Sequence, residues 1–244
     1  MAFMLCSIDG GLARLTLNRP ERLNALSIEV FEEIDRHLDT IGQEDIGCVL
    51  LDGAGRSFCA GHDLDGIADG SENKAASALE SRVIERLATL PMPLVAAVRG
   101  HCLTGGLELV LAADIIIAAD DAKFADTHGK WDLVPIWGLS QRLPRRVGQA
   151  KAYEMMFASR TYSGIEAAQM GLANFCVPSA DLDAEAERFC RDILANSWRA
   201  TRAVKTLIAK TEGMSLAEGI RYELEHTEGR GPEMPDRLAR MRKK

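Results

Sequence analysis

The sequence predicts an α/β fold with mostly parallel strands, and two observations support this. Short apolar or alternating segments recur through the first half of the chain, and segments with helical periodicity separate them. Strands that alternate with helices favour parallel pairing, because each crossover helix returns the chain to the same end of the sheet. At 244 residues and 47% hydrophobic, the chain is long enough to bury one large core.

The strands expected in the first half are short and bounded by turn-forming residues. We assign them to residues 12–17, 48–52, 94–98 and 115–118. Residues 27–41 carry apolar side chains at helical spacing behind Ser27, a residue type that caps helices. A second helix is expected over 75–90, ending where Pro91 and Pro93 break it before the next strand.

Beyond about Arg146 the strand signals fade and helical periodicity remains. Helices are expected at residues 149–158, 163–170, 182–195, 200–210 and 216–230. We predict a helical layer that packs on the core or on another subunit, and not a second catalytic domain. The expected division is a catalytic core over 1–188 and a helical region over 189–244.

Composition narrows the function classes. A formal charge of -7 disfavours nucleic-acid binding, although residues 237–244 are locally basic. The six cysteines form no CxxC pair and lie mostly in apolar runs, which predicts free thiols, a reducing compartment and no metal site. With no leader pattern and no run of about 20 apolar residues, the chain is expected to be cytoplasmic and to contact no membrane.

Glu108 is the most informative single residue. It lies in the apolar run that follows Gly105 and Gly106, where packing requires no acid. A carboxyl in such a place needs a strong donor or a raised pKa, and both point to chemistry. Glycines at the start of a helix also let a ligand approach backbone N–H groups that lack helical acceptors. The sequence therefore predicts an acid beside an anion-stabilising corner.

A second distinctive segment, residues 56–65, follows the strand at 48–52. Loops at the carboxyl ends of parallel strands are the usual ligand sites of α/β sheets. A backbone N–H from this loop and one from the corner at Gly105 can converge on a carbonyl oxygen that gains negative charge. Together, the two segments indicate such an anion-stabilising site much more specifically than either segment alone.

These segments resemble the crotonase, or enoyl-CoA hydratase/isomerase, superfamily. The resemblance spans nearly the whole chain, in order, through residues 15–26, 57–64, 93–114, 141–148 and 167–172. It implies a spiral core of repeated ββα units, a C-terminal helical trimerisation region, and a homotrimer or dimer of trimers. The implied ligand is an acyl-CoA thioester, with coenzyme A present only as part of the substrate and no tightly bound cofactor.

The resemblance also implies site residues. It implies an oxyanion hole formed by the backbone N–H groups of His62 and Gly105. The adenine of coenzyme A is implied to lie beside Ala60. The path of coenzyme A is implied to run along His62, Asp63, Leu64 and Asp65. Arg22 is a candidate contact to its phosphates. Trp131 and Trp137 either shape the acyl pocket or serve packing.

The sequence departs from the hydratase pattern at the second acid. Hydratases of the superfamily place two glutamates around one water; Glu108 matches the first, and the second falls on His128. Histidine is suited to proton transfer near neutral pH. We therefore predict that Glu108 and His128 act on one water, while His128 as a structural residue, or Asp126 or Asp132 as the carboxylate, remain alternatives.

Three functions compete at this stage. The leading prediction is addition or elimination of water on an enoyl-CoA. The same site with Glu108 as the only proton shuttle suits an enoyl-CoA isomerase or an acyl-CoA decarboxylase. A non-catalytic acyl-CoA-binding protein is the third. The sequence does not distinguish the acyl chain, the pathway, or trimer from hexamer.

Overall fold

The computed structural model describes residues 2–63 and 74–242. Its main sheet has the strand order β1-β2-β3-β4-β6-β9, in which β1 and β2 are antiparallel and the later pairs are parallel. The strands are β1 (Met4–Asp9), β2 (Leu12–Leu17), β3 (Cys48–Gly53), β4 (Leu94–Val98), β6 (Ile115–Ala119) and β9 (Phe175–Val177). A smaller sheet joins β5 (His101–Leu103), β7 (Lys123–Ala125) and β8 (Tyr162–Ser163).

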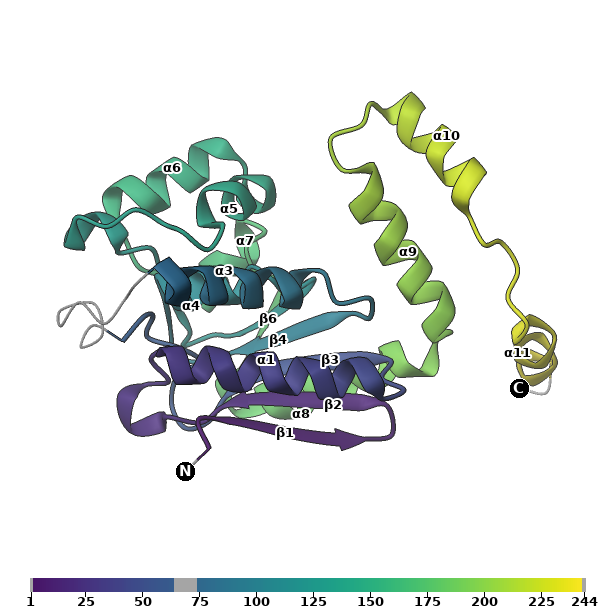
Figure 1. Ribbon diagram of the computed structural model, residues 1–244, viewed down its shortest axis with the longest axis horizontal. Helices are drawn as coiled ribbons and strands as arrows, with labels where there is room; N and C mark the ends of the chain where they lie inside the picture. The colour runs from purple at the N-terminus through teal and green to yellow at the C-terminus, as the bar shows by residue number, and fades with distance from the viewer. Residues whose placement is uncertain (1, 64–73, 243–244) are drawn as a thin grey trace.

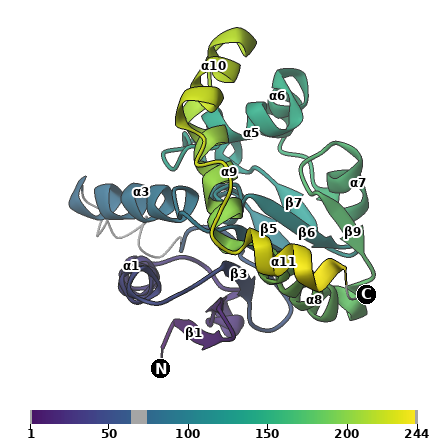
Figure 2. The same cartoon turned by 90° about the vertical axis from the view of Figure 1, so that its right-hand side faces the viewer.

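Helices cover both sides of the main sheet (Figures 1 and 2). Helix α1 (Ile28–Gln43) packs beside α3 (Lys74–Ala88) on one side, and α8 (Leu182–Ala195) crosses β2, β3, β4 and β6 on the other. The remaining helices of the core are α4 (Gly105–Val110), α5 (Leu139–Val147), α6 (Gln149–Ala158) and α7 (Gly164–Gln169). Two strands followed by a helix recur, as in β1-β2-α1 and β4-β5-α4, which agrees with the predicted ββα units.

The four predicted strands and the parallel pairing are confirmed, but the region beyond Arg146, where the strand signals fade and helices are expected, also contains two strands. Strands β8 and β9 lie there, with two and three residues. Segments this short show no alternation in the sequence, and pairing creates them: Phe175 pairs with Ile117 of β6. Ser27 occupies the N-cap of α1 as expected, but its hydroxyl donates to Glu29 Oε2 at 2.6 Å and caps no backbone N–H.

The last three helices form an arm that stands away from the core (Figure 1). They are α9 (Trp198–Thr211), α10 (Leu216–His226) and α11 (Met234–Met241), and none of their residues is buried. Helix α9 contacts the core along its length: the Trp198 indole lies over Gly11 and Gly47, Lys205 pairs with Asp114 at 2.6 Å, and Glu212 at its end pairs with Arg145 at 2.8 Å. Helix α11 contacts α8 through Arg237, which donates to the Ala195 carbonyl at 2.9 Å. The expected boundary at 188 lies inside the unbroken helix α8.

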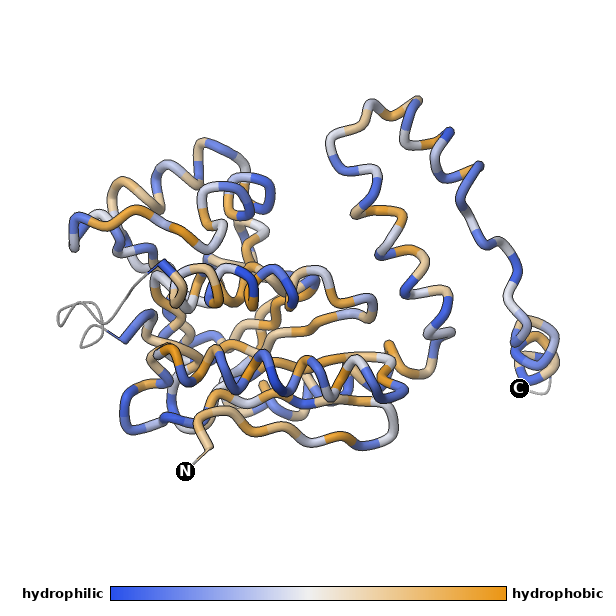
Figure 3. Tube along the Cα trace, viewed as in Figure 1, coloured by the Kyte–Doolittle hydropathy of each residue, from blue (hydrophilic) through white to orange (hydrophobic). Residues whose placement is uncertain are grey.

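Hydrophobic residues recur along the arm (Figure 3), and many of them are exposed among the described residues. Large hydrophobic residues with more than a third of their surface exposed lie on or between its helices: Val204, Ile208, Met214, Leu216, Ile220, Leu224, Met234, Leu238 and Met241. Exposed apolar surface of this extent is typical of interaction surfaces.

The order of strands determines where the functional residues meet. Strands β3, β4 and β6 are neighbours in the parallel sheet. The segments that follow them therefore leave the same edge of the sheet: the loop up to Asp63, the corner that begins α4, and the turn after β7. In the described ranges, no helix has the length and apolarity needed to span a membrane.

Candidate active site

The corner between β5 and α4 is held in an unusual backbone conformation. Thr104 has φ 50 and ψ -108, a region that non-glycine residues rarely adopt. Its N–H donates to the Ala125 carbonyl at 2.8 Å, and its hydroxyl lies 2.5 Å from the Thr127 hydroxyl. These bonds join the corner to the segment after β7 and place Gly105 at the first position of α4, where its N–H has no acceptor within the helix.

The backbones of Gly105 and His62 lie next to each other and line the same cavity. Leu26 bridges to the 61–63 segment through its N–H to Gly61 and its carbonyl to Asp63, so the N–H of His62 points to the opposite side. A Cβ added at Gly105 would lie 3.2 Å from the His62 nitrogen and 2.7 Å from the Trp137 ring. Only glycine leaves this space open.

Glu108 lies one turn into α4 and is 1% exposed. Its Oε1 accepts the N–H groups of Trp137, at 2.9 Å, and Leu139, at 3.3 Å. Burial raises the pKa of Glu108, although His128 and the two backbone bonds act in the opposite direction. The second oxygen, Oε2, remains available and faces His128.

His128 completes a chain of three side chains. Its Nε2 lies 3.5 Å from Glu108 Oε2, and its Nδ1 lies 2.6 Å from Asp126 Oδ1. Asp126 is 1% exposed and follows directly after β7. The structure thus brings Glu108 and His128 together, and places Asp126 behind the imidazole. Asp132 is exposed and does not line the pocket.

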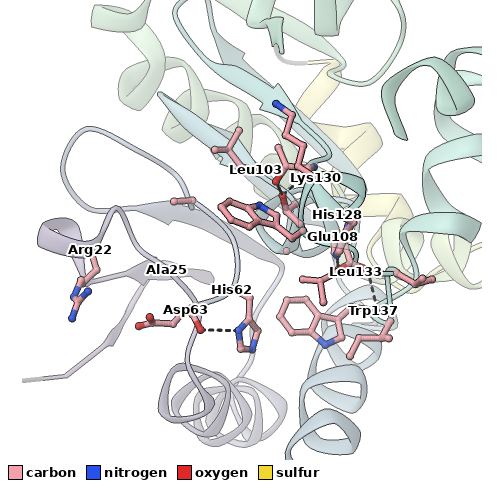
Figure 4. Close-up of a pocket in the computed structure, with 17 residues that line it drawn as sticks. Arg22, Ala25, His62, Asp63, Leu103, Glu108, His128, Lys130, Leu133 and Trp137 are labelled. Atoms are coloured by element: carbon pink, nitrogen blue, oxygen red, sulfur yellow. Dashed lines mark hydrogen bonds and ion pairs between the residues drawn. The ribbon is translucent and has the colours of Figure 1, made fainter. Parts of the chain in front are cut away.

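Gly105, Glu108 and His128 line a cavity of about 630 Å³ (Figure 4). Arg22 and Asp63 lie at one side of it, and Glu108 and His128 at the other, with His62 and Trp137 between them. The wall near Glu108 is apolar: Trp137 is 4% exposed and packs edge-on against Phe31, with ring centres 4.9 Å apart. Trp131, Val134 and Ile136 form an exposed apolar rim.

The predicted coenzyme A residues are only partly accounted for. Ala60, His62, Asp63 and Arg22 line the cavity, while Leu64 and Asp65 lie outside the described residues. The Asp63 carboxylate pairs with Arg19 at 2.9 Å.

Each ring nitrogen of the His62 imidazole lies near an oxygen of the protein. Its Nδ1 is 3.2 Å from the Asp63 carbonyl, and its Nε2 is 3.4 Å from Glu80, a buried carboxylate of α3 that the sequence analysis did not single out. Within residues 2–63 and 74–242, no cluster of three or more histidine, cysteine or acidic side chains is placed to hold a metal ion.

Comparison with known proteins gives the same family from sequence and from structure. A family model described as enoyl-CoA hydratase/isomerase matches residues 7–229. A Mycobacterium tuberculosis protein named "probable enoyl-CoA hydratase echA8" is 36% identical over 221 residues, which cover 90% of this chain and 86% of that protein. The Escherichia coli 1,2-epoxyphenylacetyl-CoA isomerase is 33% identical over 233 residues, covering 93% of this chain and 89% of the isomerase.

Solved structures agree. The enoyl-CoA hydratase of Bacillus anthracis superposes with a TM-score of 0.93 at 31% identity, covering 99% of this chain and 96% of that one. A Thermobifida fusca protein solved with acetoacetyl-CoA gives a TM-score of 0.85 at 30% identity, covering 100% and 96% of the two chains. The family match over most of the chain, the shared fold and the buried acid beside a glycine corner lead to one conclusion: the chain belongs to the enoyl-CoA hydratase/isomerase family.

Proposed function

We propose that this enzyme adds water across the double bond of a 2-enoyl-CoA thioester, with Glu108 and His128 acting on the same water. The observation that carries the proposal is the 3.5 Å separation of Glu108 Oε2 and His128 Nε2 in the wall of the cavity. A water at hydrogen-bond distance, about 2.8 Å, from both atoms fits on the cavity side of the pair. Two backbone N–H donors lie in the same cavity.

The thioester carbonyl is proposed to bind between the N–H groups of His62 and Gly105. Charge that develops on its oxygen is then stabilised by two donors fixed in advance, which costs no reorganisation during the reaction. Coenzyme A would extend past Ala60 and Asp63 toward Arg22, with Leu64 and Asp65 following in the chain. The chemistry requires no further cofactor, since acid, base and donors all come from the protein.

In the proposed addition, His128 takes one proton from water and Glu108 gives one proton to the substrate. His128 Nε2 removes a proton from water as the water oxygen bonds to C3, and the electron pair of the double bond moves to the thioester oxygen. Neutral Glu108 then gives its proton to C2, and the carbon–oxygen double bond re-forms. The raised pKa of Glu108 favours the neutral acid that this step needs. Transfer of the proton from His128 to Glu108 across 3.5 Å restores the starting state.

Isomerisation is the second candidate, because one carboxylate, Glu108, is sufficient to move a proton between two carbons. Relatives named as isomerases include the Escherichia coli protein above and a peroxisomal dienoyl-CoA isomerase of Arabidopsis thaliana, 30% identical over 230 residues. Isomerisation differs from hydration because it leaves the mass of the substrate unchanged in ordinary water.

Incubation of a panel of acyl-CoA thioesters in D₂O, followed by mass spectrometry, tests the proposal. Hydration of a 2-enoyl-CoA adds one D₂O, isomerisation exchanges hydrogen without adding oxygen, and decarboxylation of a malonyl-type thioester releases carbon dioxide. We expect the D₂O adduct from at least one short, medium or aromatic 2-enoyl-CoA. Exchange without addition would establish the isomerase instead, and binding without any mass change would identify a non-catalytic acyl-CoA-binding protein.

We further propose that residues 189–244 assemble cytoplasmic subunits into a trimer or a dimer of trimers, with residues 1–188 forming the catalytic core. The exposed apolar side chains of α9 and α10 support this, because a partner is needed to remove them from water. Light scattering on the purified enzyme should give three or six times the 26.6 kDa chain mass. The mass of a single chain at micromolar concentration would refute the assembly.

A further inference from the structure

We propose that Asp126 is a positioning residue that fixes His128 with its proton on Nδ1 and balances the positive charge His128 gains during the reaction. This inference rests on the proposed role of His128. Sequence reasoning treated Asp126 only as an alternative to His128. The structure instead places the carboxylate behind the imidazole, on the side away from Glu108.

The bonds of Asp126 fix the orientation of the ring. One oxygen, Oδ1, lies 2.6 Å from His128 Nδ1 and also accepts the backbone N–H of His128 at 3.1 Å. A ring flip would remove Nδ1 from this oxygen and deprive a buried carboxylate of one of these two hydrogen bonds, which is unfavourable. The other ring nitrogen, Nε2, therefore remains directed at Glu108 and the cavity.

The proton on the ring follows from the chemistry of the acceptor. An ionised carboxylate only accepts hydrogen bonds, so the nitrogen that contacts it must carry hydrogen. In the neutral imidazole the other nitrogen, Nε2, then holds the lone pair, as a base directed at the cavity must. The opposite tautomer would point an N–H at the water and give no base.

Charge gives Asp126 a second effect. Among the ion pairs of the described residues, Asp126 pairs only with His128. The charged or titratable groups placed against the imidazole are Asp126 behind it and Glu108 in front, while Lys130 lines the same cavity. When His128 takes a proton, the resulting cation is paired with a carboxylate in a buried setting, where an unpaired charge is costly. Serine proteases use a buried aspartate behind histidine in the same way.

The test compares Asp126→Asn with Asp132→Asn, the same substitution at an exposed position of the next turn. Asp126→Asn keeps the size of the side chain and removes its charge. We expect kcat for the hydration reaction to fall by about 10²- to 10⁴-fold, with KM changed less than about threefold. Asp132→Asn should retain wild-type rates. Equal activity of the two variants would overturn the proposal.

Nitrogen NMR of histidine-labelled, ligand-free enzyme tests the tautomer independently of any activity. The chain has five histidines, and loss of one signal set in His128→Gln assigns the residue. We expect the Nδ1–H form in the wild type and a changed tautomer ratio in Asp126→Asn. An Nε2–H form in the wild type would refute the inference. If the tautomer is as expected and no substrate is hydrated, Asp126 still fixes the His128 tautomer, whereas its charge-balancing role and the proposed reaction fail.

Testing Asp126→Asn in a His128→Glu variant distinguishes a positioning role of Asp126 from a merely structural one. In His128→Glu, Asp126 faces a carboxylate in place of an imidazole, so its negative charge becomes unfavourable. Adding Asp126→Asn should therefore raise kcat in the His128→Glu background, although it lowers kcat in the wild type. A structural role predicts loss in both backgrounds, and that result would overturn the proposal even if the single variant is inactive.

Discussion

Replacing Glu108 with glutamine is expected to lower kcat by about 10²- to 10⁴-fold, the usual contribution of a general acid or base. Glutamine keeps a carbonyl oxygen that accepts the N–H groups of Trp137 and Leu139, so the local structure is retained. What it loses is the proton for C2. Binding of a coenzyme A thioester, measured by calorimetry, should change little, because the carboxyl serves the reaction and not the ligand.

Both kcat and stability are expected to depend on pH through the protonation of Glu108. Glu108 must be protonated to act, so kcat of the wild type should fall as pH rises through its pKa, which burial places above the ordinary value of 4.5. The folded state binds this proton more tightly than the unfolded state, so its stabilisation is present at low pH and lost as pH rises. Glu108→Gln should therefore unfold at a higher temperature than the wild type at alkaline pH.

The matched control is Glu32→Gln, the same change at an exposed position of α1. It should leave both kcat and the melting temperature unchanged. A Glu108→Gln enzyme that retains more than about a tenth of wild-type kcat would contradict the assignment, since general acid–base residues contribute at least about 10²-fold. A loss of activity accompanied by a lower melting temperature would point to misfolding, which the stability measurement distinguishes.

Gly105→Ala keeps the backbone N–H, but its Cβ is expected to displace the thioester oxygen and to lower kcat by about 10²- to 10³-fold, as much as the loss of one donor to a developing oxyanion. The added Cβ would lie 2.7 Å from the Trp137 ring and 3.2 Å from the His62 nitrogen, in the space proposed for the thioester oxygen. Initial rates on the enoyl-CoA identified by the D₂O panel measure the effect. The substitution should not destabilise helix α4 itself, because alanine is a better helix former than glycine.

Gly42→Ala is the control for the glycine change. Gly42 lies in α1, where an added Cβ meets no atom within 4 Å. That variant should keep wild-type kcat and gain about 0.5–1 kcal/mol of stability from reduced chain entropy. If Gly105→Ala is as active as Gly42→Ala, the thioester oxygen does not bind at the corner.

Sequence reasoning succeeded where a residue contrasts with its surroundings. Glu108 stands out because it interrupts an apolar run, and the structure shows it buried. Strands β2 and β4 have the predicted bounds, because apolar runs between turn residues are local signals. Strand β9 was missed because its three residues become a strand only by pairing with β6.

The backbone donors to Glu108 could not be predicted for the same reason, although His128 was expected beside it. The N–H groups that hold Glu108 belong to Trp137 and Leu139, 29 and 31 residues further along the chain. Asp126 and His128 are two residues apart, and in a strand their side chains would point the same way without defining a contact. Only the turn after β7, held by the bond between Thr104 and Thr127, sets the carboxylate against Nδ1.

The arm has a thermodynamic consequence. Because α9, α10 and α11 bury none of their residues within their own chain, their folded state depends on the surface that covers them. When another subunit supplies that surface, folding of the arm and association become one equilibrium governed by mass action. The arm then melts at a temperature that rises with protein concentration, whereas the sheet and its covering helices melt independently of dilution.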